Sequence, residues 1–288
     1  MIKLAGLIKY IYIHPLLWVV IGLAIMTAHF IELSLFLFII LVHELGHAGA
    51  ASFFSWRIKR IALLPFGGVA EMEEHGNRPL KEEMIVILSG PLQHLWMMGA
   101  AYILFQFSLL PDVIYQHFIQ FNLMVLLFNL LPIWPLDGGK LIFLWLSLYH
   151  PFPDAHRKCL LLSVGSIAVF IIITLFISPF NLNIWVVVSF LLFALYHEWK
   201  QGRYVFIRFL LERYYGKNRA FRTLKPLVVK EEEMVIHVLE KFQRGYKHPI
   251  IIEKDGQEKG SLDENELLHA YFAEKIVTAR IGDLLYVY

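Results

Sequence analysis

The segment His43-Glu44-Leu45-Gly46-His47 has the residue types and the spacing that most clearly predict chemistry in this sequence. His-Glu-x-x-His on a helix places two imidazoles one turn apart on one face, at a spacing that chelates Zn²⁺. The glutamate beside the first histidine is positioned to act as a general base on a water that the metal activates. The sequence therefore predicts a metal site with Glu44 as its base.

The motif lies inside an apolar segment, Leu33 to Phe54, that is long enough to span a membrane. Ionisable residues are costly at that depth, so those within a span are functional candidates by default. The alternative is a buried polar cluster that only holds helices together. We favour a metal site within the membrane over that structural alternative.

The composition sets the class of protein and narrows the choice of ligands. Of the 288 residues, 58% are hydrophobic, which is too apolar for an ordinary soluble protein. The single cysteine, Cys159, excludes an intrachain disulfide and a site with several thiolates. Any metal must therefore be held by histidine and carboxylate.

Six apolar segments of spanning length follow one another along the chain, near Tyr10–Phe30, Leu33–Phe54, Glu83–Leu109, Val113–Trp134, Cys159–Ile177 and Asn183–Trp199. Lysines and arginines gather before the first segment and after the second, fourth and sixth. Under the positive-inside rule, this pattern places both termini in the cytoplasm. The sequence predicts an integral, multi-pass α-helical membrane protein with about six transmembrane helices.

A catalytic zinc ion usually takes three protein ligands, so the two histidines need a partner. Asp137 follows the fourth apolar segment and precedes two glycines that let backbone approach closely, which suits a third ligand. The alternative is an Asp that caps a helix or a turn. Pro132 and Pro135 should interrupt helical pairing beside it. A site made from these residues would open toward the cytoplasm.

The segment Arg57–Met72 is not a span, and its Pro65-Phe66-Gly67-Gly68 run favours a hairpin or an extended segment lying against the bilayer. Irregular backbone is tolerated at that depth only where protein buries it or where it lines a cavity. An ordinary cytosolic loop is the alternative. An exposed strand edge here could hold an unwound substrate by adding a strand.

The composition changes after the last apolar segment. The basic and aromatic stretch Gln201–Lys225 indicates an amphipathic helix along the inner leaflet, or a linker helix packed on the next domain. Charges return in Pro226–Tyr288, which indicates a small α+β module. We expect a membrane domain at residues 1–200, a linker at 201–225 and a cytoplasmic module at 226–288.

The module is expected to run strand, helix, strand, turn, helix. The expected elements are Leu227–Val229, Glu231–Gln243, His248–Glu253, Lys254–Gln257 and Asp263–Phe272.

The ordered motifs HELGH, PFGGV, SGP and NLLPIWPLDGG together resemble the site-2 protease family, which are intramembrane zinc metalloproteases. The likeness is strongest to the bacterial subgroup with a C-terminal CBS domain, which activates a pro-sigma factor in sporulation. The resemblance implies one zinc ion per chain, with Glu44 as base. The residues that it implies as zinc ligands are His43, His47 and Asp137. Those that it implies near the substrate are Asn129, Pro135, Gly67 and Gly68.

One position departs from the pattern of that family. Many members have Asn at the end of G-P-x-x-N, whereas this chain reads Gly90-Pro91-Leu92-Gln93-His94. A lone histidine in a span is more often a donor that bridges helices than a ligand. We therefore expect His94 to bridge helices.

The module resembles a CBS domain, in which a G-x-x-T-x-x-D-L-L stretch often binds adenosine nucleotides such as ATP. Asp263 replaces the Thr and Glu266 the Asp of that stretch. The two carboxylates are either nucleotide-binding residues or a capping box at the start of the last helix. CBS modules usually work in pairs, so the resemblance also implies a homo-oligomer or docking of a soluble substrate portion.

Three functions remain at this stage. The first is a protease that cuts a membrane-associated protein, such as a pro-sigma factor, under a possible inhibitory membrane partner and without direct nucleic-acid contact. The second is a metal transporter, which would more often show internal repeats and several chelating residues along a path. The third is an inactive homologue that serves as a scaffold, which would be expected to lack Glu44 or a ligand. The protease hypothesis fits best.

Overall fold

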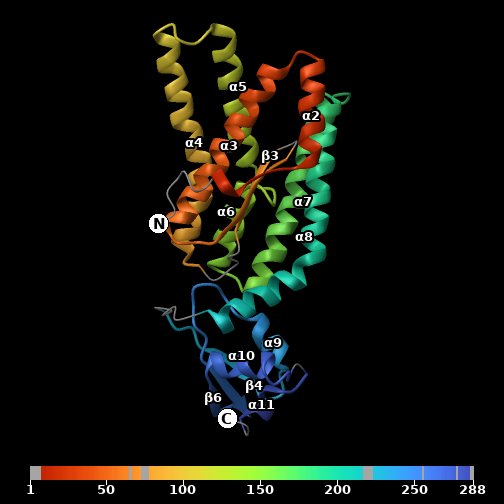
Figure 1. Cartoon of the computed structure of the whole chain (residues 1–288). Coiled ribbons are helices and arrows are strands. Elements are labelled where there is room, and N and C mark those ends of the chain that lie inside the picture. Colours follow the sequence, from red (N-terminus) through yellow and green to blue (C-terminus); the bar gives the residue numbers. More distant parts are fainter. Residues whose placement is uncertain are drawn as a thin grey trace. The chain divides into compact units, whose positions relative to one another are not determined.

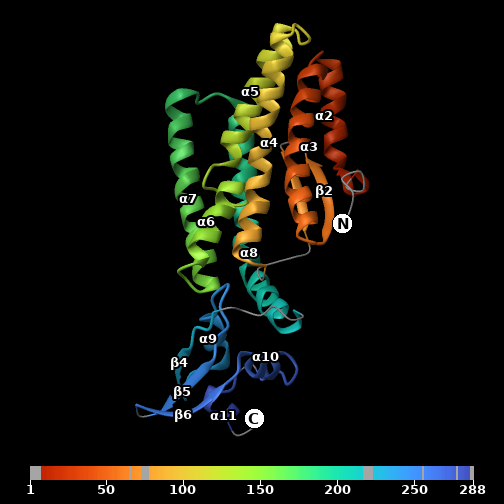
Figure 2. The same cartoon turned by 90° about the vertical axis from the view of Figure 1, so that its left-hand side faces the viewer.

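Long apolar runs become helices in the computed structural model, which describes residues 8–64, 67–72, 78–216, 223–254, 256–276 and 278–285 (Figures 1 and 2). Contacts divide the chain into two units, described separately below. The first unit holds residues 1–74, 81–141 and 162–194. The second holds residues 75–80, 142–161 and 195–288. Pro65 and Phe66 of the PFGGV motif lie outside the described residues.

The helices from the apolar part of the chain are α2 Pro15–Met26, α3 Phe30–Phe53, α4 Leu80–Gln106, α5 Asp112–Asn129, α6 Asp137–Ser147, α7 Phe152–Ile177 and α8 Leu182–Tyr215. Within the described residues, α3, α4, α7 and α8 are long and apolar enough to cross a membrane, and α2 is a shorter apolar helix. A mostly helical protein with several membrane spans is thereby confirmed. The count of six spans stays a prediction.

Three strands form a small sheet beside α3: β1 Ile11–Ile13, β2 Ile58–Leu64 and β3 Gly67–Met72, with a 3₁₀ helix, η1 Ile8–Tyr10, before β1. β1 pairs with β2 in parallel, and β2 pairs with β3 in an antiparallel hairpin. The predicted hairpin is confirmed over the loop alternative. The prediction that residues 11–13 begin the first span was wrong, because their backbone pairs with β2 before α2 starts.

The helix α3 lies at the centre of the core of the first unit. On one face, Ile40 packs with Leu17 of α2 and Leu63 of β2. On another face, Ile39 packs with Met97 of α4 and Val125 of α5. Apolar burial therefore holds the helix that carries His-Glu-x-x-His between the sheet and two further helices.

Several boundaries differ from the sequence-based expectation. α5 ends at Asn129, so residues 130–136 form a loop, as expected where Pro132 and Pro135 interrupt helical pairing. The short helix α6 was not predicted, because its apolar run is too short for a span. α8 continues through residue 200 to Tyr215, so most residues of the predicted linker belong to this helix. The three predicted domain ranges, 1–200, 201–225 and 226–288, stay a prediction.

The second unit contains the predicted α+β module. Its elements are β4 Leu227–Lys230, α9 Val235–Glu240, β5 Ile250–Lys254, β6 Gln257–Leu262, α10 Glu264–Phe272 and α11 Ile281–Leu284. β5 is the central strand, parallel to β4 and antiparallel to β6. The predicted elements occur in the predicted order. β6 was missed because a short polar strand carries a weak pattern, and α11 was missed because a helix of 4 residues is too short to show a period.

The end of α8 packs on this module rather than standing free. Phe209 and Leu210 are fully buried within the second unit, and the Tyr214 ring stacks on Phe272 of α10. Tyr214 Oη also lies 2.8 Å from Nδ1 of His269. For these last turns, the alternative of a helix packed on the next domain is therefore confirmed.

Candidate active site

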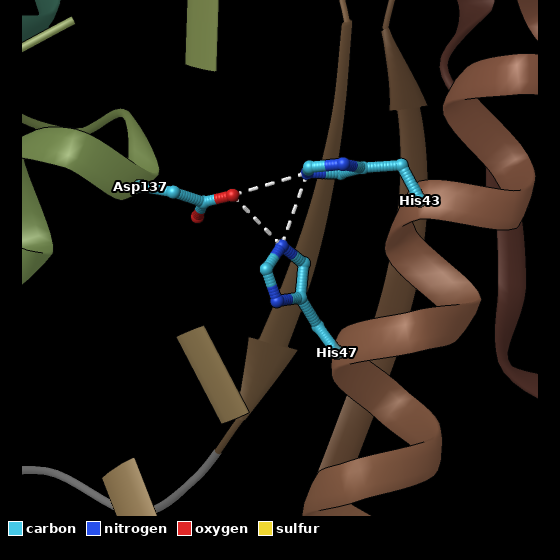
Figure 3. A group of neighbouring side chains, drawn as sticks. All are labelled: His43, His47 and Asp137. Carbon is cyan, nitrogen blue, oxygen red and sulfur yellow. Dashed lines mark hydrogen bonds and ion pairs between the residues drawn. The ribbon is translucent and has the colours of Figure 1, made fainter. Parts of the chain in front are cut away.

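His43, His47 and Asp137 converge in the first unit, as Figure 3 shows. The two Nε2 atoms lie 3.1 Å apart, and each lies 3.1 Å from Oδ2 of Asp137. The exposed fractions are 3% for His43, 5% for His47 and 2% for Asp137. Two residues one turn apart on α3 and a third from the start of α6 thus form one buried cluster.

The loop before α6 delivers Asp137 to this cluster through close backbone contacts. A Cβ on Gly138 would lie 2.3 Å from the Leu130 carbonyl oxygen, and one on Gly139 would lie 2.5 Å from the Ile133 carbonyl carbon. The expected close backbone approach at both glycines is confirmed. Asp137 is also the first residue of α6, so it begins a helix as well as facing the histidines.

Gly90 of α4 makes room for the cluster. A Cβ at this position would lie 2.2 Å from Nε2 of His47 and 2.9 Å from Cε1 of His43. A side chain there would occupy the space between the two imidazoles. The sequence reasoning used the SGP motif only as a family signature and missed this role.

The tautomers of the histidines test whether a metal fits. Nδ1 of His47 lies 2.8 Å from the Val86 carbonyl oxygen, which can only accept, so Nδ1 carries the proton. The Nε2 of His47 is then a bare acceptor that faces the carboxylate of Asp137. Acceptors at 3.1 Å repel each other unless a cation lies between them. The spacing suits one ion with bonds of about 2.0–2.1 Å, so the cluster fits zinc.

Glu44 lies beside this cluster and is held by β3. It is buried, and its Oε2 accepts a hydrogen bond of 2.8 Å from the backbone N–H of Ala70. A Cβ on Gly68 would lie 2.4 Å from Cγ of Glu44, so only glycine leaves space for this side chain. The N–H of Ala70 points away from β2, which means that the outer edge of β3 faces the glutamate.

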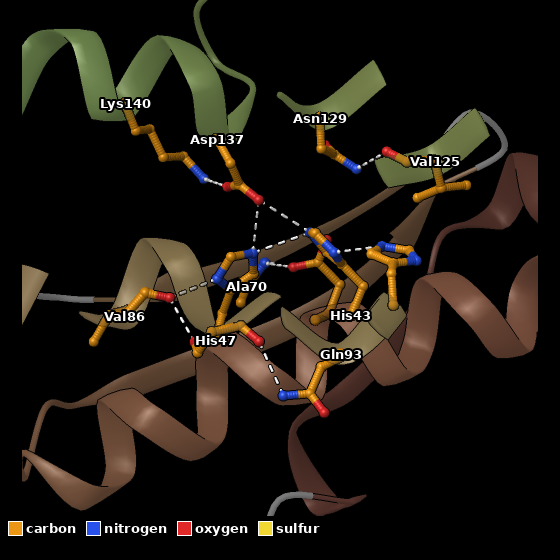
Figure 4. A network of polar contacts seen from close by, with 12 residues as sticks. His43, His47, Ala70, Val86, Gln93, Val125, Asn129, Asp137 and Lys140 are labelled. Atoms are coloured by element: carbon orange, nitrogen blue, oxygen red, sulfur yellow. Dashed lines mark hydrogen bonds and ion pairs between the residues drawn. The ribbon is translucent and has the colours of Figure 1, made fainter. Parts of the chain in front are cut away.

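Lys140 approaches the cluster, whereas the candidate residue Asn129 contacts its own helix. Lys140 Nζ lies 3.2 Å from Oδ1 of Asp137 and leaves Oδ2 to face the histidines (Figure 4). Asn129 is half-buried at the end of α5, and its Nδ2 donates to the Val125 carbonyl. Lys140 was missed, although its spacing of three residues from Asp137 on one helix was a usable signal.

His94 is fully buried and is not part of the ligand cluster. Its Nε2 lies 3.0 Å from Nδ1 of His43, and its Nδ1 lies 3.0 Å from Oδ1 of Asn122. His94 on α4 therefore joins α3 to α5, which confirms the expected bridging role. The sequence reasoning missed that its partner would be His43, and it did not single out Asn122.

Asp263 and Glu266 lie in the second unit and form the capping box of α10. Asp263 accepts from the Asn265 N–H at 2.8 Å, and Glu266 accepts from the Asp263 N–H at 2.7 Å. Burial raises the pKa of Asp263, but the ammonium of Lys247 and the Asn265 N–H outweigh it and lower the pKa. The capping alternative is confirmed, and nucleotide binding stays a prediction.

A buried set of two histidines and a carboxylate, with a glutamate beside it, is the arrangement of a zinc peptidase centre. Because it is built on α3, which is long and apolar enough to cross a membrane, the class of protein is an intramembrane metalloprotease. The comparisons with known proteins agree with this class.

The sequence pattern of peptidase family M50 matches residues 31–118 and 108–173. Stage IV sporulation protein FB of Bacillus subtilis (strain 168) is 51% identical over 286 residues, 99% of either protein. A zinc metalloprotease of Methanocaldococcus jannaschii is 32% identical over 131 residues, 43% of this chain and 38% of that one. The structure of a site-2 protease from M. jannaschii has a TM-score of 0.52 at 28% identity, covering 65% of this chain and 89% of that one.

The chain belongs to peptidase family M50, the site-2 proteases, and is a zinc-dependent intramembrane metalloprotease.

Proposed function

We propose that this protein hydrolyses a peptide bond in a membrane-associated transcription-factor precursor, such as a pro-sigma factor, near the cytoplasmic face of the membrane. The observation that carries the proposal is the buried triangle of ligand atoms from His43, His47 and Asp137, next to Glu44. The similarity to a sporulation protein over nearly the whole chain supports the choice of substrate class.

The roles of the site residues follow from their positions. His43, His47 and Asp137 would hold one zinc ion, which supplies a Lewis acid to polarise the scissile carbonyl. Glu44 would take the proton of the attacking water and pass it to the leaving amine. Lys140 neutralises the second carboxylate oxygen of Asp137 and so keeps the other oxygen for the metal.

The substrate would bind as an extended strand along β3. The amide of Ala70 faces outward toward Glu44, so a peptide added to this edge would lie next to the base. Gly67 and Gly68 carry no side chains that could obstruct it. Asn129 and Pro135, in the chain that leads to Asp137, would contact the same peptide from the other side.

The remaining features of the proposal concern the surroundings of the site. Both termini would be cytoplasmic, as the distribution of basic residues indicates. The module would act as a CBS domain that pairs between chains or docks a soluble part of the substrate, with ATP as a possible ligand. An inhibitory membrane protein would restrain the enzyme, and no direct nucleic-acid contact is expected.

The experiment compares purified wild type with Glu44→Gln and Asp137→Asn in detergent, each incubated with a membrane-tethered pro-sigma factor. We expect about one zinc ion per chain in wild type and in Glu44→Gln. Cleavage by Glu44→Gln should fall by roughly 100-fold or more, because the base is lost while the metal stays. Asp137→Asn should lose zinc and cleavage together.

Three results would contradict the proposal. Full cleavage by Glu44→Gln would remove the base assignment. Zinc binding without cleavage of any precursor, combined with metal uptake into liposomes, would favour a transporter, and zinc binding with neither activity would favour an inactive scaffold.

A further inference from the structure

The two histidines of the zinc site are oriented in different ways. Nδ1 of His47 donates to the backbone carbonyl of Val86, which can only accept and therefore fixes the tautomer. Nδ1 of His43 instead lies 3.0 Å from Nε2 of His94. An imidazole nitrogen can donate or accept, so the tautomer of His43 depends on where His94 carries its own proton.

Asn122 determines which ring nitrogen of His94 carries the proton. Its Nδ2 donates to the Phe118 carbonyl oxygen at 2.9 Å, so its Oδ1 is the atom that faces His94 Nδ1 at 3.0 Å. An amide oxygen only accepts, so His94 must carry its proton on Nδ1. Its Nε2 is then an acceptor for Nδ1–H of His43, and Nε2 of His43 is left with a lone pair that faces Asp137.

We propose that Asn122 and His94 form a relay of hydrogen bonds that positions His43 as a zinc ligand and fixes its metal-binding tautomer. Every donor along the relay meets one acceptor, from α5 through α4 to α3. His94 and Asn122 are fully buried, so water does not compete for these hydrogen bonds. This inference rests on the proposed zinc ligation by His43, His47 and Asp137.

The relay uses neutral groups throughout. Metal-bound histidines usually donate to a carboxylate, a backbone carbonyl or water. Here a neutral imidazole orients His43 without adding a second negative charge near Asp137. His94 is thus a positioning residue, and its loss should affect the binding of metal rather than the binding of substrate.

The test uses four variants of the full-length protein in detergent. His94→Phe keeps most of the ring volume but removes the acceptor. His94→Gln keeps an acceptor for His43 and a donor for Asn122. Asn122→Leu breaks only the first step of the relay. Met97→Leu is the matched control, because Met97 is buried on the same helix and packs against Ile39 and Val125.

The measurements are zinc affinity by competition with a chelator and the visible absorption spectrum of the Co²⁺-loaded protein. We expect His94→Phe to weaken zinc binding about 10–100-fold and to change the cobalt spectrum. His94→Gln should restore most of the affinity, and Asn122→Leu should give a smaller loss. In cleavage assays at subsaturating zinc, kcat should fall with little change in KM.

The relay is overturned if His94→Phe binds zinc as tightly as Met97→Leu, or if His94→Gln is as weak as His94→Phe. If His94→Phe does not fold, Asn122→Leu decides, because an unchanged cobalt spectrum and affinity in that variant also overturn the relay. The variant Asp137→Asn distinguishes a failure of the proposed zinc site from a failure of the relay. If it keeps zinc, the zinc site itself is wrong; if it loses zinc while the relay variants do not, only the relay is wrong.

Discussion

The zinc site and a buried ion pair between the end of α8 and α10 both remove charged groups from solvent, but they satisfy those groups in different ways. Oε1 of Glu264 accepts a hydrogen bond of 2.7 Å from Nε of Arg213, and its Oε2 accepts one of 2.9 Å from a second guanidinium nitrogen. In the zinc site, Nε2 of His43, Nε2 of His47 and Oδ2 of Asp137 lie 3.1 Å from one another, with their lone pairs facing the same point. The first arrangement is complete without a ligand, whereas the second is complete only with a cation.

The surroundings of the two clusters strengthen this contrast. Arg213 also donates to the carbonyls of Gln243 and Tyr246, and Glu264 also accepts from the backbone N–H of His248. Each charged atom of this ion pair therefore has a protein partner. Buried charge alone does not mark a functional site, whereas acceptors that face one another without a donor do.

The largest effect should come from filling the space between the two imidazoles. Gly90→Ala adds a Cβ that would lie 2.2 Å from Nε2 of His47, so the ligands cannot keep their positions. Zinc binding should fall beyond the roughly 100-fold that changes around a metal site usually cause. Gly99→Ala on the same helix is the control, because a Cβ there meets nothing within 4 Å. Equal zinc content in both variants would break the assignment of the site.

The second effect tests the completeness of the ion pair in the module. Arg213→Met leaves Glu264 buried without its cation and should destabilise the module by about 3–5 kcal/mol. Arg213→Met combined with Glu264→Leu should recover about half of that loss, since no charge remains buried. Hydrogen exchange of the β5 amides in the full-length protein measures both. Zinc content should stay unchanged, and a loss of zinc in these variants would contradict the separation of roles.

The third effect separates the base from the metal. Gly68→Ala would push its Cβ into Glu44 and move the carboxylate, so kcat should fall roughly 100-fold, the scale of a lost general base. Zinc affinity should stay at the wild-type value, because the three atoms nearest to the new Cβ all belong to Glu44. Gly49→Ala on α3 has open space around the new Cβ and serves as control. A parallel loss of zinc in Gly68→Ala would refute the separation.

The smallest effect concerns pH. Burial lowers the pKa of His248 below its ordinary value of 6.5, and the charge of Arg213 lowers it further. Hydrogen bonds with the backbone carbonyls of Lys225 and Gln243, and the charge of Glu264, oppose this shift. The unfolded module therefore binds the proton more readily than the folded one. The stability from neutral His248 is present above pH 6.5 and declines as pH falls below it.

Hydrogen exchange of β5 between pH 7.5 and 5.5, corrected for the intrinsic exchange rate, measures this decline. His248→Asn should show a flatter dependence on pH. An equal slope in the variant and in wild type would remove His248 as the cause.

The residues of the active site were predictable because their chemistry is local. The spacing of His43 and His47 is set by one turn of helix, and Glu44 is fixed beside them by the chain itself. Asp137, far away in the chain, was predictable as a candidate third ligand because it is a carboxylate that follows an apolar segment and precedes two glycines. The hairpin of β2 and β3 was predictable from its glycines and short apolar runs.

From the amino-acid sequence alone, the candidate ligands, the candidate base, the long apolar helices and four of the strands and helices of the module could be predicted: β4, α9, β5 and α10. The roles of α4 and α5 at the site can be seen only in the three-dimensional structure, because these roles depend on packing between segments far apart in the chain. Gly90 makes room for the imidazoles, and His94 with Asn122 orients His43. No spacing rule predicts such partners, since a glycine or a polar residue on an apolar helix gains its meaning only from the atoms that face it.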